Sequence, residues 1–249
     1  MIRIIRIGFA GLFVVPTFIL SLIPFWCILF LRLIKCQKAA DKLTEKSFKR
    51  ILYLCAFFIG AKVHVIGEEK IPPIGEKICY FANHQSMIDI CLPTYAKNRM
   101  ASYIAKVEIK KIPIVSNWLV LTHGVFLDRK NPRESIKAMI TGSANVKNHI
   151  PMIIFPEGTR SKDAQVHTFK AGSFKLATRA GAYVQPVAIA NARKVAEGAT
   201  SLLRQDVYVK YLDPIDTSVL TEEEILELPK KVEDLIRAEV DYYQNAKTK

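Results

Sequence analysis

Metal-site and disulfide patterns are missing from this chain of 249 residues. Its cysteines number five and include no Cys-x-x-Cys pair and no Cys/His spacing suited to zinc. They stand mostly in apolar runs, which is typical of buried thiols in a reducing compartment. Internal repeats and low-complexity linkers are also absent. The sequence therefore predicts no metal and no disulfide framework.

Acidic residues are comparatively few. The chain has 23 Asp and Glu against 36 Lys and Arg, which gives a formal net charge of +13. Such an excess predicts an anionic partner, which leaves nucleic acid, anionic lipid headgroups or a phosphorylated substrate. Hydrophobic residues make up 50% of the chain, a composition that excludes disorder and is compatible with membrane contact.

Charge is wholly absent from residues 7–31. The run is long enough to cross a bilayer once and lacks the cleavage site of a signal peptide. However, Pro16 and Pro24 interrupt it, and cations at both ends give a single span no clear orientation. A helical hairpin or a shallow kinked insertion is therefore favoured over a true span. Residues 1–60 are predicted to form a membrane-associated helical segment.

A second apolar stretch, residues 51–59, follows the mixed, basic segment 37–50. Cations just ahead of it resemble those of an interfacial helix at headgroup depth. A core helix of the main domain is the alternative.

Residues 61–249 alternate short apolar runs with helical stretches, the pattern of an α/β domain. We expect a mixed central sheet of about seven strands flanked by helices. The expected strands are Val63–Ile66, Ile78–Ala82, Tyr103–Ala105, Val125–Leu127, Met152–Phe155, Tyr183–Ile189 and Val207–Tyr211. The expected helices are Ser86–Ala96, Pro132–Asn148, Gly172–Ala180 and Glu222–Tyr243.

The first segment that carries chemistry joins a strand to a predicted helix. Residues 78–89 read ICYFANHQSMID, so His84 follows the carboxyl end of a strand, where ligands bind in open α/β sheets. Histidine suits a general base because its unperturbed pKa lies near neutrality. With about 3.6 residues per helical turn, Asp89 can meet His84 only if the histidine precedes the helix and the aspartate lies in its first turn. Alternatively, Ser86 and Asp89 form a capping box and His84 is a loop residue.

Two more predicted strands lead into cationic residues. Residues 124–129 read GVFLDR, and Arg129 can grip a phosphate with its guanidinium or form an ordinary surface ion pair. Residues 152–161 read MIIFPEGTRS, a strand followed by a turn. Within that turn Glu157 can accept a hydrogen bond from a polyol, Gly158 permits close backbone approach, and Arg160 offers a phosphate fork. A plain turn would also favour Pro-Glu-Gly, although it would not require the Thr-Arg-Ser that follows.

The last segment, residues 184–189, reads VQPVAI. It is a buried strand whose proline favours an edge or bulged position, because proline cannot donate to the ladder. Lining an apolar acyl site is one interpretation, and core packing is the default.

These four segments, in this order and spacing, resemble those of the glycerolipid acyltransferases, and in particular the bacterial 1-acyl-sn-glycerol-3-phosphate acyltransferases. One segment alone would be weak evidence, whereas four in order are specific. The resemblance covers about residues 62–211, and the apolar N-terminal segment fits it too.

The resemblance implies transfer of an acyl group from acyl-CoA or acyl-carrier protein to the sn-2 hydroxyl of lysophosphatidic acid, giving phosphatidic acid. It implies that His84 is the general base, that Asp89 orients its imidazole, and that no acyl-enzyme forms. It implies no metal or cofactor, a place at the bacterial inner (cytoplasmic) membrane with the site facing the cytoplasm, and no nucleic-acid partner. The substrate-binding residues implied are Lys106, Arg129, Glu157, Gly158, Thr159 and Arg160.

Three rival hypotheses remain at this point. A related acyltransferase could use glycerol 3-phosphate, lysophosphatidylcholine or an aminolipid as acceptor. A nucleic-acid-binding protein would show salt-sensitive DNA or RNA binding and no role for His84. A non-catalytic membrane scaffold would have no activity for a His84 substitution to remove.

Overall fold

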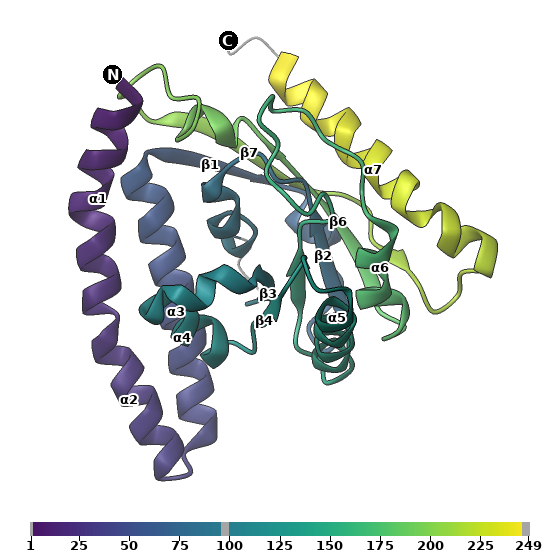
Figure 1. Cartoon of the computed structure of the whole chain (residues 1–249), viewed down its shortest axis with the longest axis horizontal. Helices are drawn as coiled ribbons and strands as arrows, with labels where there is room; N and C mark the ends of the chain where they lie inside the picture. The colour runs from purple at the N-terminus through teal and green to yellow at the C-terminus, as the bar shows by residue number, and fades with distance from the viewer. Residues whose placement is uncertain (1, 96–99, 246–249) are drawn as a thin grey trace.

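A mixed sheet of eight strands forms the centre of the protein (Figure 1). The computed structural model describes residues 2–95 and 100–245. The strand order is β1-β7-β6-β2-β5-β3-β4, with β8 paired to β6. Strands β6, β2, β5, β3 and β4 are mutually parallel, and β7 joins β6 antiparallel. The strands are β1 (Ala61–Ile66), β2 (Ile78–Ala82), β3 (Ser102–Lys106), β4 (Val125–Leu127), β5 (Met152–Ile154), β6 (Tyr183–Ala190), β7 (Gln205–Tyr211) and β8 (Ile215–Asp216).

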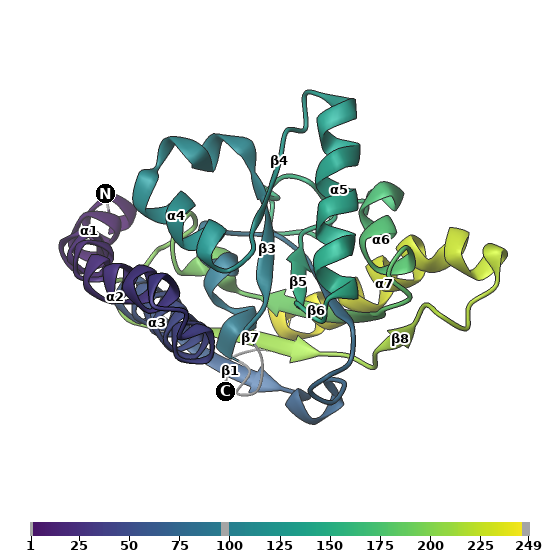
Figure 2. The same cartoon turned by 90° about the horizontal axis from the view of Figure 1, so that it is seen from below.

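Helices cover both faces of the sheet (Figures 1 and 2). Strand β2 shows why both faces need cover, because side chains alternate along a strand and all five of its residues are buried. Tyr80 points into the core beside α3 and α4, whereas Phe81 points into the core beside α5, α6 and α7. The helices are α1 (Ile2–Leu20), α2 (Leu22–Leu33), α3 (Gln37–Ile59), α4 (Pro113–Leu121), α5 (Pro132–Lys147), α6 (Ala171–Thr178) and α7 (Glu222–Asn245).

All seven predicted strands are present, as are the helices predicted over α5, α6 and α7. The helix predicted from Ser86 is wrong: the chain forms two short 3₁₀ turns, Met87–Cys91 and Pro93–Tyr95, and the predicted end at Ala96 lies outside the described residues. Pro93 lacks the N–H that a continuing α-helix needs, so the turn that begins at Met87 cannot continue as a regular helix. Helix α4 and strand β8 were not predicted.

The proline of the VQPVAI segment is not at a sheet edge. Strand β6 lies between β2 and β7, and Val184, Val187 and Ile189 are fully buried, so core packing is the role the structure shows. Pro186 is tolerated at the point where the antiparallel neighbour changes. Strand β8 pairs up to Val184 and β7 pairs from Val187, so no partner requires an N–H from Pro186.

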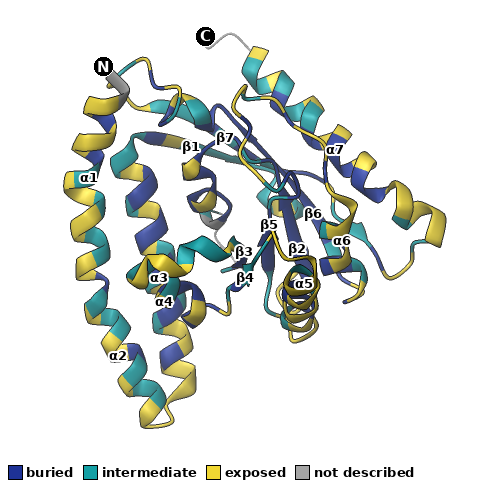
Figure 3. Cartoon of the chain, in the orientation of Figure 1, coloured by how far each residue is buried: buried dark blue, intermediate teal, exposed yellow. Residues whose placement is uncertain are grey.

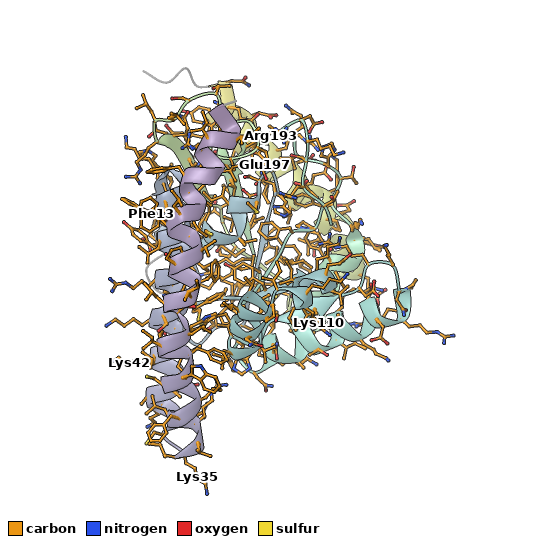
Figure 4. The ribbon with its side chains drawn as sticks, turned by 60° about the vertical axis from the view of Figure 1, so that its left-hand side comes forward. Phe13, Lys35, Lys42, Lys110, Arg193 and Glu197 are labelled. Atoms are coloured by element: carbon orange, nitrogen blue, oxygen red, sulfur yellow. The ribbon has the colours of Figure 1, made fainter. Side chains whose placement is uncertain are left out.

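The N-terminal helices form a hairpin, but its turn is not inside the charge-free run. Helices α1 and α2 follow one another along one line, despite Pro16 and Pro24, and α3 returns antiparallel beside them (Figure 1). The turn lies between Leu33 and Gln37, and Lys35 at its tip points away from the domain (Figure 4). Residues 51–59 belong to α3, whose inner face packs in the core through Ile51, Leu52, Cys55 and Ala56.

Arg6 anchors the start of this hairpin instead of facing water. Its guanidinium is buried and donates to four backbone oxygens, those of Ile59 and Gly60 at the end of α3 and those of Ser201 and Leu203 before β7. These bonds satisfy carbonyl groups that a helix end leaves open. Arg6 therefore fixes α1 to the α/β domain.

Much of the surface of α1 and α2 is exposed (Figure 3), and it carries many large apolar side chains. Residues 4–33 are long and apolar enough to cross a membrane, and their most apolar window has a mean hydropathy of 2.4 and is only 17% buried. Among the cysteines, Cys27 and Cys36 are exposed here, contrary to the prediction of buried thiols, and none of the five, all within the described residues, forms a disulfide. Large exposed side chains on this surface include Phe9, Leu12, Val15, Ile19, Ile23, Trp26 and Phe30.

Candidate active site

Parallel strands bring the predicted site residues to one edge of the sheet. Strands β2, β5, β3 and β4 are adjacent and parallel, so their carboxyl ends lie side by side. His84 follows β2, Lys106 ends β3, and Arg129 follows β4. The turn with Thr159 and Arg160 follows β5. Residues far apart in the sequence therefore share one rim, as expected for ligand sites in α/β sheets.

A histidine–aspartate dyad occupies this rim. Nδ1 of His84 lies 2.8 Å from Oδ2 of Asp89, and the same oxygen accepts from the backbone N–H of Gln85 at 2.6 Å and of Ser86 at 2.7 Å. Ser86 also caps the 3₁₀ turn, with Asp89 completing a capping box. The capping box and the His84–Asp89 contact expected from the sequence are therefore both present, since one carboxylate caps the turn and holds the imidazole.

This arrangement selects the tautomer of the imidazole. Two backbone donors already point at Oδ2 of Asp89, so the His84 ring makes a favourable contact only by donating from Nδ1. The lone pair is then on Nε2, on the opposite side of the ring from the buried aspartate. Burial raises the pKa of the Asp89 carboxyl, and the hydrogen bonds from His84, Ser86 and Gln85 oppose that rise. His84 is consequently equipped to accept a proton at Nε2.

The cavity distinguishes this dyad from two other histidine–aspartate pairs. His64 Nε2 lies 2.6 Å from Asp206 Oδ1 on the outer strands, and His167 Nε2 lies 3.0 Å from Asp163 Oδ1 in an exposed loop. Neither histidine lines a described cavity, whereas His84 does. A carboxylate neighbour is therefore not sufficient to mark a site, and access to a substrate-sized space is the additional requirement.

A cavity of about 460 Å³ opens beside His84 and has two chemically different parts. Its size is within the roughly 300–1,000 Å³ usual for small-molecule sites. The apolar part is enclosed by helices α1, α3 and α4 and strand β3, through residues Phe18, Phe48, Ile51, Leu52, Tyr103, Val115, Trp118 and Leu119. The polar part is formed by His84, Lys106, Arg129, Thr159 and Arg160.

Two of the predicted phosphate-binding cations already have carboxylate partners. Lys106 Nζ lies 2.8 Å from Glu108, and Arg160 Nη1 lies 2.8 Å from Glu197. The side chains of Lys106 and Arg160 are 53% and 50% exposed, so these pairs are weak and can exchange for an anionic ligand. Arg129 lines the cavity without an ion pair among the residues the structure describes.

Glu157 and Gly158 do not line the dyad cavity. Glu157 is buried, and its Oε1 accepts a hydrogen bond of 3.0 Å from the backbone N–H of His84. The backbone N–H of Ser161 donates to the His84 carbonyl at 2.8 Å, so this loop holds His84 from both sides. Glu157 thus supports the dyad loop, and its contact with a polyol stays a prediction. Gly158, with φ of 77°, lines a neighbouring cavity.

The buried carboxyl of Glu157 should make stability depend on pH. Burial raises its pKa from 4.5 to about 8, although the bond from the His84 N–H opposes the rise. Because the folded-state pKa is the higher one, the stabilising effect of the bound proton is complete below about pH 4.5 and is lost as pH rises through 8. Glu157→Gln removes this titration. Thermal unfolding should show the variant a few degrees more stable than the wild type near pH 9 and equal to it near pH 4.5. Glu227→Gln, at an exposed position, serves as control, and a difference that stays constant with pH would contradict the assignment.

Two residues of the site were missed from the sequence. The Phe155 ring stacks on the His84 ring with centroids 4.3 Å apart and restricts the imidazole to one plane. Glu197 pairs with Arg160, accepts from the Ser86 hydroxyl, and accepts from the backbone N–H of Met87 at 2.9 Å. Phe155 directly precedes the Pro-Glu-Gly turn, so its place at the site could have been predicted from the sequence. Glu197 lies 111 positions from Ser86 without a local pattern to mark it.

The α/β fold agrees with the comparisons made with known proteins. The sequence model of the family described as Acyltransferase matches residues 62–190, just over half of the chain. The chain belongs to this acyltransferase family. A solved structure of the 1-acyl-sn-glycerophosphate (LPA) acyltransferase PlsC from Thermotoga maritima superposes with a TM-score of 0.83 at 28% identity, covering 100% of both chains.

Curated relatives extend this comparison. The chain is 31% identical over 206 residues to a 1-acyl-sn-glycerol-3-phosphate acyltransferase of Saccharomyces cerevisiae, covering 81% of this chain and 66% of that protein. It is 35% identical over 128 residues to one of Chlamydomonas reinhardtii, covering 51% of this chain and 38% of that protein. The chain thus spans between about two fifths and two thirds of the length of these relatives.

Proposed function

We propose that the protein transfers a fatty acyl group from an acyl thioester to the free hydroxyl of 1-acyl-sn-glycerol 3-phosphate. The observation that carries the proposal is the single cavity that joins a base, an apolar compartment and a cationic rim. A lysophospholipid phosphate offers the matching features: a hydroxyl, an acyl chain and a phosphate. Relatives of similar sequence and structure are named for this acceptor.

In the proposed reaction His84 Nε2 accepts the proton of the acceptor hydroxyl while Asp89 stabilises the resulting imidazolium. The acceptor oxygen attacks the thioester carbonyl, a C–O bond forms, and the C–S bond breaks. The thiolate then takes the proton from Nε2 and leaves as a thiol. No serine or cysteine of the described chain lines this cavity, so direct attack is favoured over an acyl-enzyme.

The two parts of the cavity divide the binding of the acceptor and acyl group between them. Apolar surface between α3, α4 and β3 suits an alkyl chain, because burying it is favourable at about 25 cal/mol per Å². The acceptor phosphate lies a short distance from its hydroxyl and must therefore sit close to His84. Lys106, Arg129 and Arg160 are the cations placed there.

A panel of acceptors tests the proposal. Purified protein should release thiol from an acyl thioester with lysophosphatidic acid as acceptor and much more slowly with lysophosphatidylcholine or lysophosphatidylethanolamine. Arg160→Ala should raise the KM for lysophosphatidic acid about tenfold or more and change the KM for the donor little, because a charge-assisted contact to phosphate is lost. Thiol release independent of any acceptor, or equal effects of Arg160→Ala on both KM values, would count against this assignment.

Membrane association of the hairpin is part of the proposal. The exposed apolar face of α1 and α2 suits insertion into the interface. Full spanning is disfavoured, because α3 packs alongside and carries exposed Lys38, Asp41, Lys42 and Lys46 at the same level. When the acceptor is supplied in anionic vesicles in the same assay, the protein should sediment with them.

A further inference from the structure

A second cavity of about 380 Å³ adjoins the dyad cavity on the side of α5 and α6. Ile104, Arg129 and Phe155 line both spaces, so only the ring that stacks on His84 and its neighbours separate the second cavity from the base. The acceptor, as proposed above, is accounted for by the first cavity. The second is therefore a binding space without an assigned ligand.

Its lining is strongly cationic. The lining side chains include Arg129, Lys170, Lys175 and Arg179 and no acidic residue. In contrast to Lys106 and Arg160, none of these four has a carboxylate within ion-pair distance in the described parts of the chain. Uncompensated cations around a cavity favour a polyanionic ligand.

The cations are spread along a line that leads away from the base. Lys170 lies against Gly158 in the loop after β5, and a Cβ added at Gly158 would be 2.7 Å from Lys170 Nζ. Lys175 and Arg179 follow at a spacing of four residues, so they share a face of α6 and its C-terminal cap. At about 1.5 Å per residue, Gly172 and Arg179 are about 10 Å apart along the helix. Cations spread over this length favour a ligand with more than one negative charge.

Small residues leave room at the near end. Ser173 and Ser135 line the cavity, and Gly172 in the first turn of α6 has nothing within 4 Å of the position where a Cβ would lie. The Ser135 hydroxyl already donates to the Asp128 carbonyl, and the Ser173 N–H donates to the Lys170 carbonyl. The charge of the lining side chains therefore carries the attraction for an anion.

We propose that this second cavity and the cationic ridge of Lys170, Lys175 and Arg179 bind the phosphate-bearing end of a phosphopantetheine thioester donor. Such a donor places its phosphates at the far end of a flexible arm from the reactive sulfur. The arm allows the thioester to sit at His84 while the phosphates lie along α6. The inference rests on the proposed function, because the thioester is the donor in that reaction.

Two other ligands fit the ridge less well. The phosphate of a lysophospholipid acceptor is tied closely to its hydroxyl and cannot reach Lys175 and Arg179 while the hydroxyl is at His84. A membrane surface would contact the hairpin, and α6 lies on the opposite side of the domain from α1 and α2 (Figures 1 and 2).

Charge reversal at the far end of the ridge tests the inference. The double variant Lys175→Glu, Arg179→Glu leaves the dyad and its cavity untouched. It should raise the KM for acyl-CoA about tenfold or more and leave the KM for lysophosphatidic acid within about twofold. With an S-acyl pantetheine donor, which lacks phosphate, the variant and the wild type should have the same kcat/KM. Lys231→Glu, an exposed charge reversal on α7 outside the cavity, is the matched control and should leave all these values unchanged.

Equilibrium binding separates the inference from the proposed reaction. Titration calorimetry with CoA alone should show about tenfold weaker binding by the double variant, and thermal unfolding should confirm that the variant is folded. Acyl-carrier protein is tested in parallel to identify the source of the phosphopantetheine. Weaker binding of either CoA or acyl-carrier protein by the double variant supports the site. Unchanged affinity for both overturns it, even if acyl transfer is confirmed. Conversely, failure of acyl transfer with intact, ridge-dependent CoA binding would reject the reaction and keep the site.

Discussion

Replacing His84 with alanine is expected to lower kcat for acyl transfer by about 10²–10⁴-fold, the usual contribution of general acid–base catalysis. The reason is geometric, because Nε2 is the basic nitrogen that Asp89 and its backbone contacts leave free beside the cavity. Folding should be little affected. Asp89 keeps two backbone donors in the variant, and the His84 side chain is already 15% exposed. Thioester consumption and thermal unfolding of the same preparation measure both effects.

His64→Ala is the matched control for this experiment. His64 also contacts a carboxylate, at 2.6 Å, and also stacks on an aromatic ring, that of Tyr208. It lies on the outer strands and lines no described cavity, so its removal should leave kcat within about twofold. If His84→Ala kept more than a tenth of the wild-type rate, the imidazole would not be the base. The scaffold hypothesis predicts that neither substitution changes anything.

The Asp89→Asn substitution should have the second largest effect, lowering kcat by about 10²–10⁴-fold, because the buried negative charge beside His84 is lost. An asparagine oxygen in the place of Oδ2 can still accept from the N–H groups of Gln85 and Ser86 and from Nδ1 of His84, since all three contact that one oxygen. The neutral ring therefore keeps its proton on Nδ1 and its lone pair on Nε2. The imidazolium that forms in the reaction, however, no longer faces a carboxylate charge.

Nitrogen NMR of the labelled imidazole separates the loss of the charge from a change in the tautomer. In the wild type and in Asp89→Asn the proton of the neutral ring should be on Nδ1, so that the fall in kcat reflects the lost carboxylate charge. Asp206→Asn, which alters the carboxylate beside His64, is the control and should change neither the His84 spectrum nor kcat. A normal rate in Asp89→Asn with the proton still on Nδ1 would contradict stabilisation of the imidazolium by Asp89.

The strands could be predicted because each is a short apolar run bounded by turn residues. This signal is local, and all seven predicted strands are present. The stretch after Ser86 has the composition of a helix but forms 3₁₀ turns, and Pro93 removes an N–H that a continuing α-helix would need. The position of Pro186 could not be read correctly either. Whether the N–H of a strand residue must donate to a neighbour depends on which strand lies beside it. The sequence spacing does not identify that neighbouring strand.

The contact between His84 and Asp89 could also be predicted from local sequence. His84 and Asp89 are five residues apart, so their meeting depends only on where a strand ends and a turn begins. The ion pair of Arg160 could not be predicted from local sequence, because its partner Glu197 comes from a loop 37 residues away. Burial of Arg6 was equally beyond the sequence, since its acceptors are 53 to 197 positions distant.

The amino-acid order alone was enough to predict an α/β domain, its seven main strands, and the histidine and aspartate that form the dyad. These features depend on hydrophobic periodicity and short spacings, which act over a few residues. Tertiary structure alone decided that α3 and α4 close an apolar cavity over β3, that Arg6 is buried, and that a second cationic cavity runs along α6. Each of these requires side chains from distant segments to pack together, and that packing follows from the topology of the whole sheet.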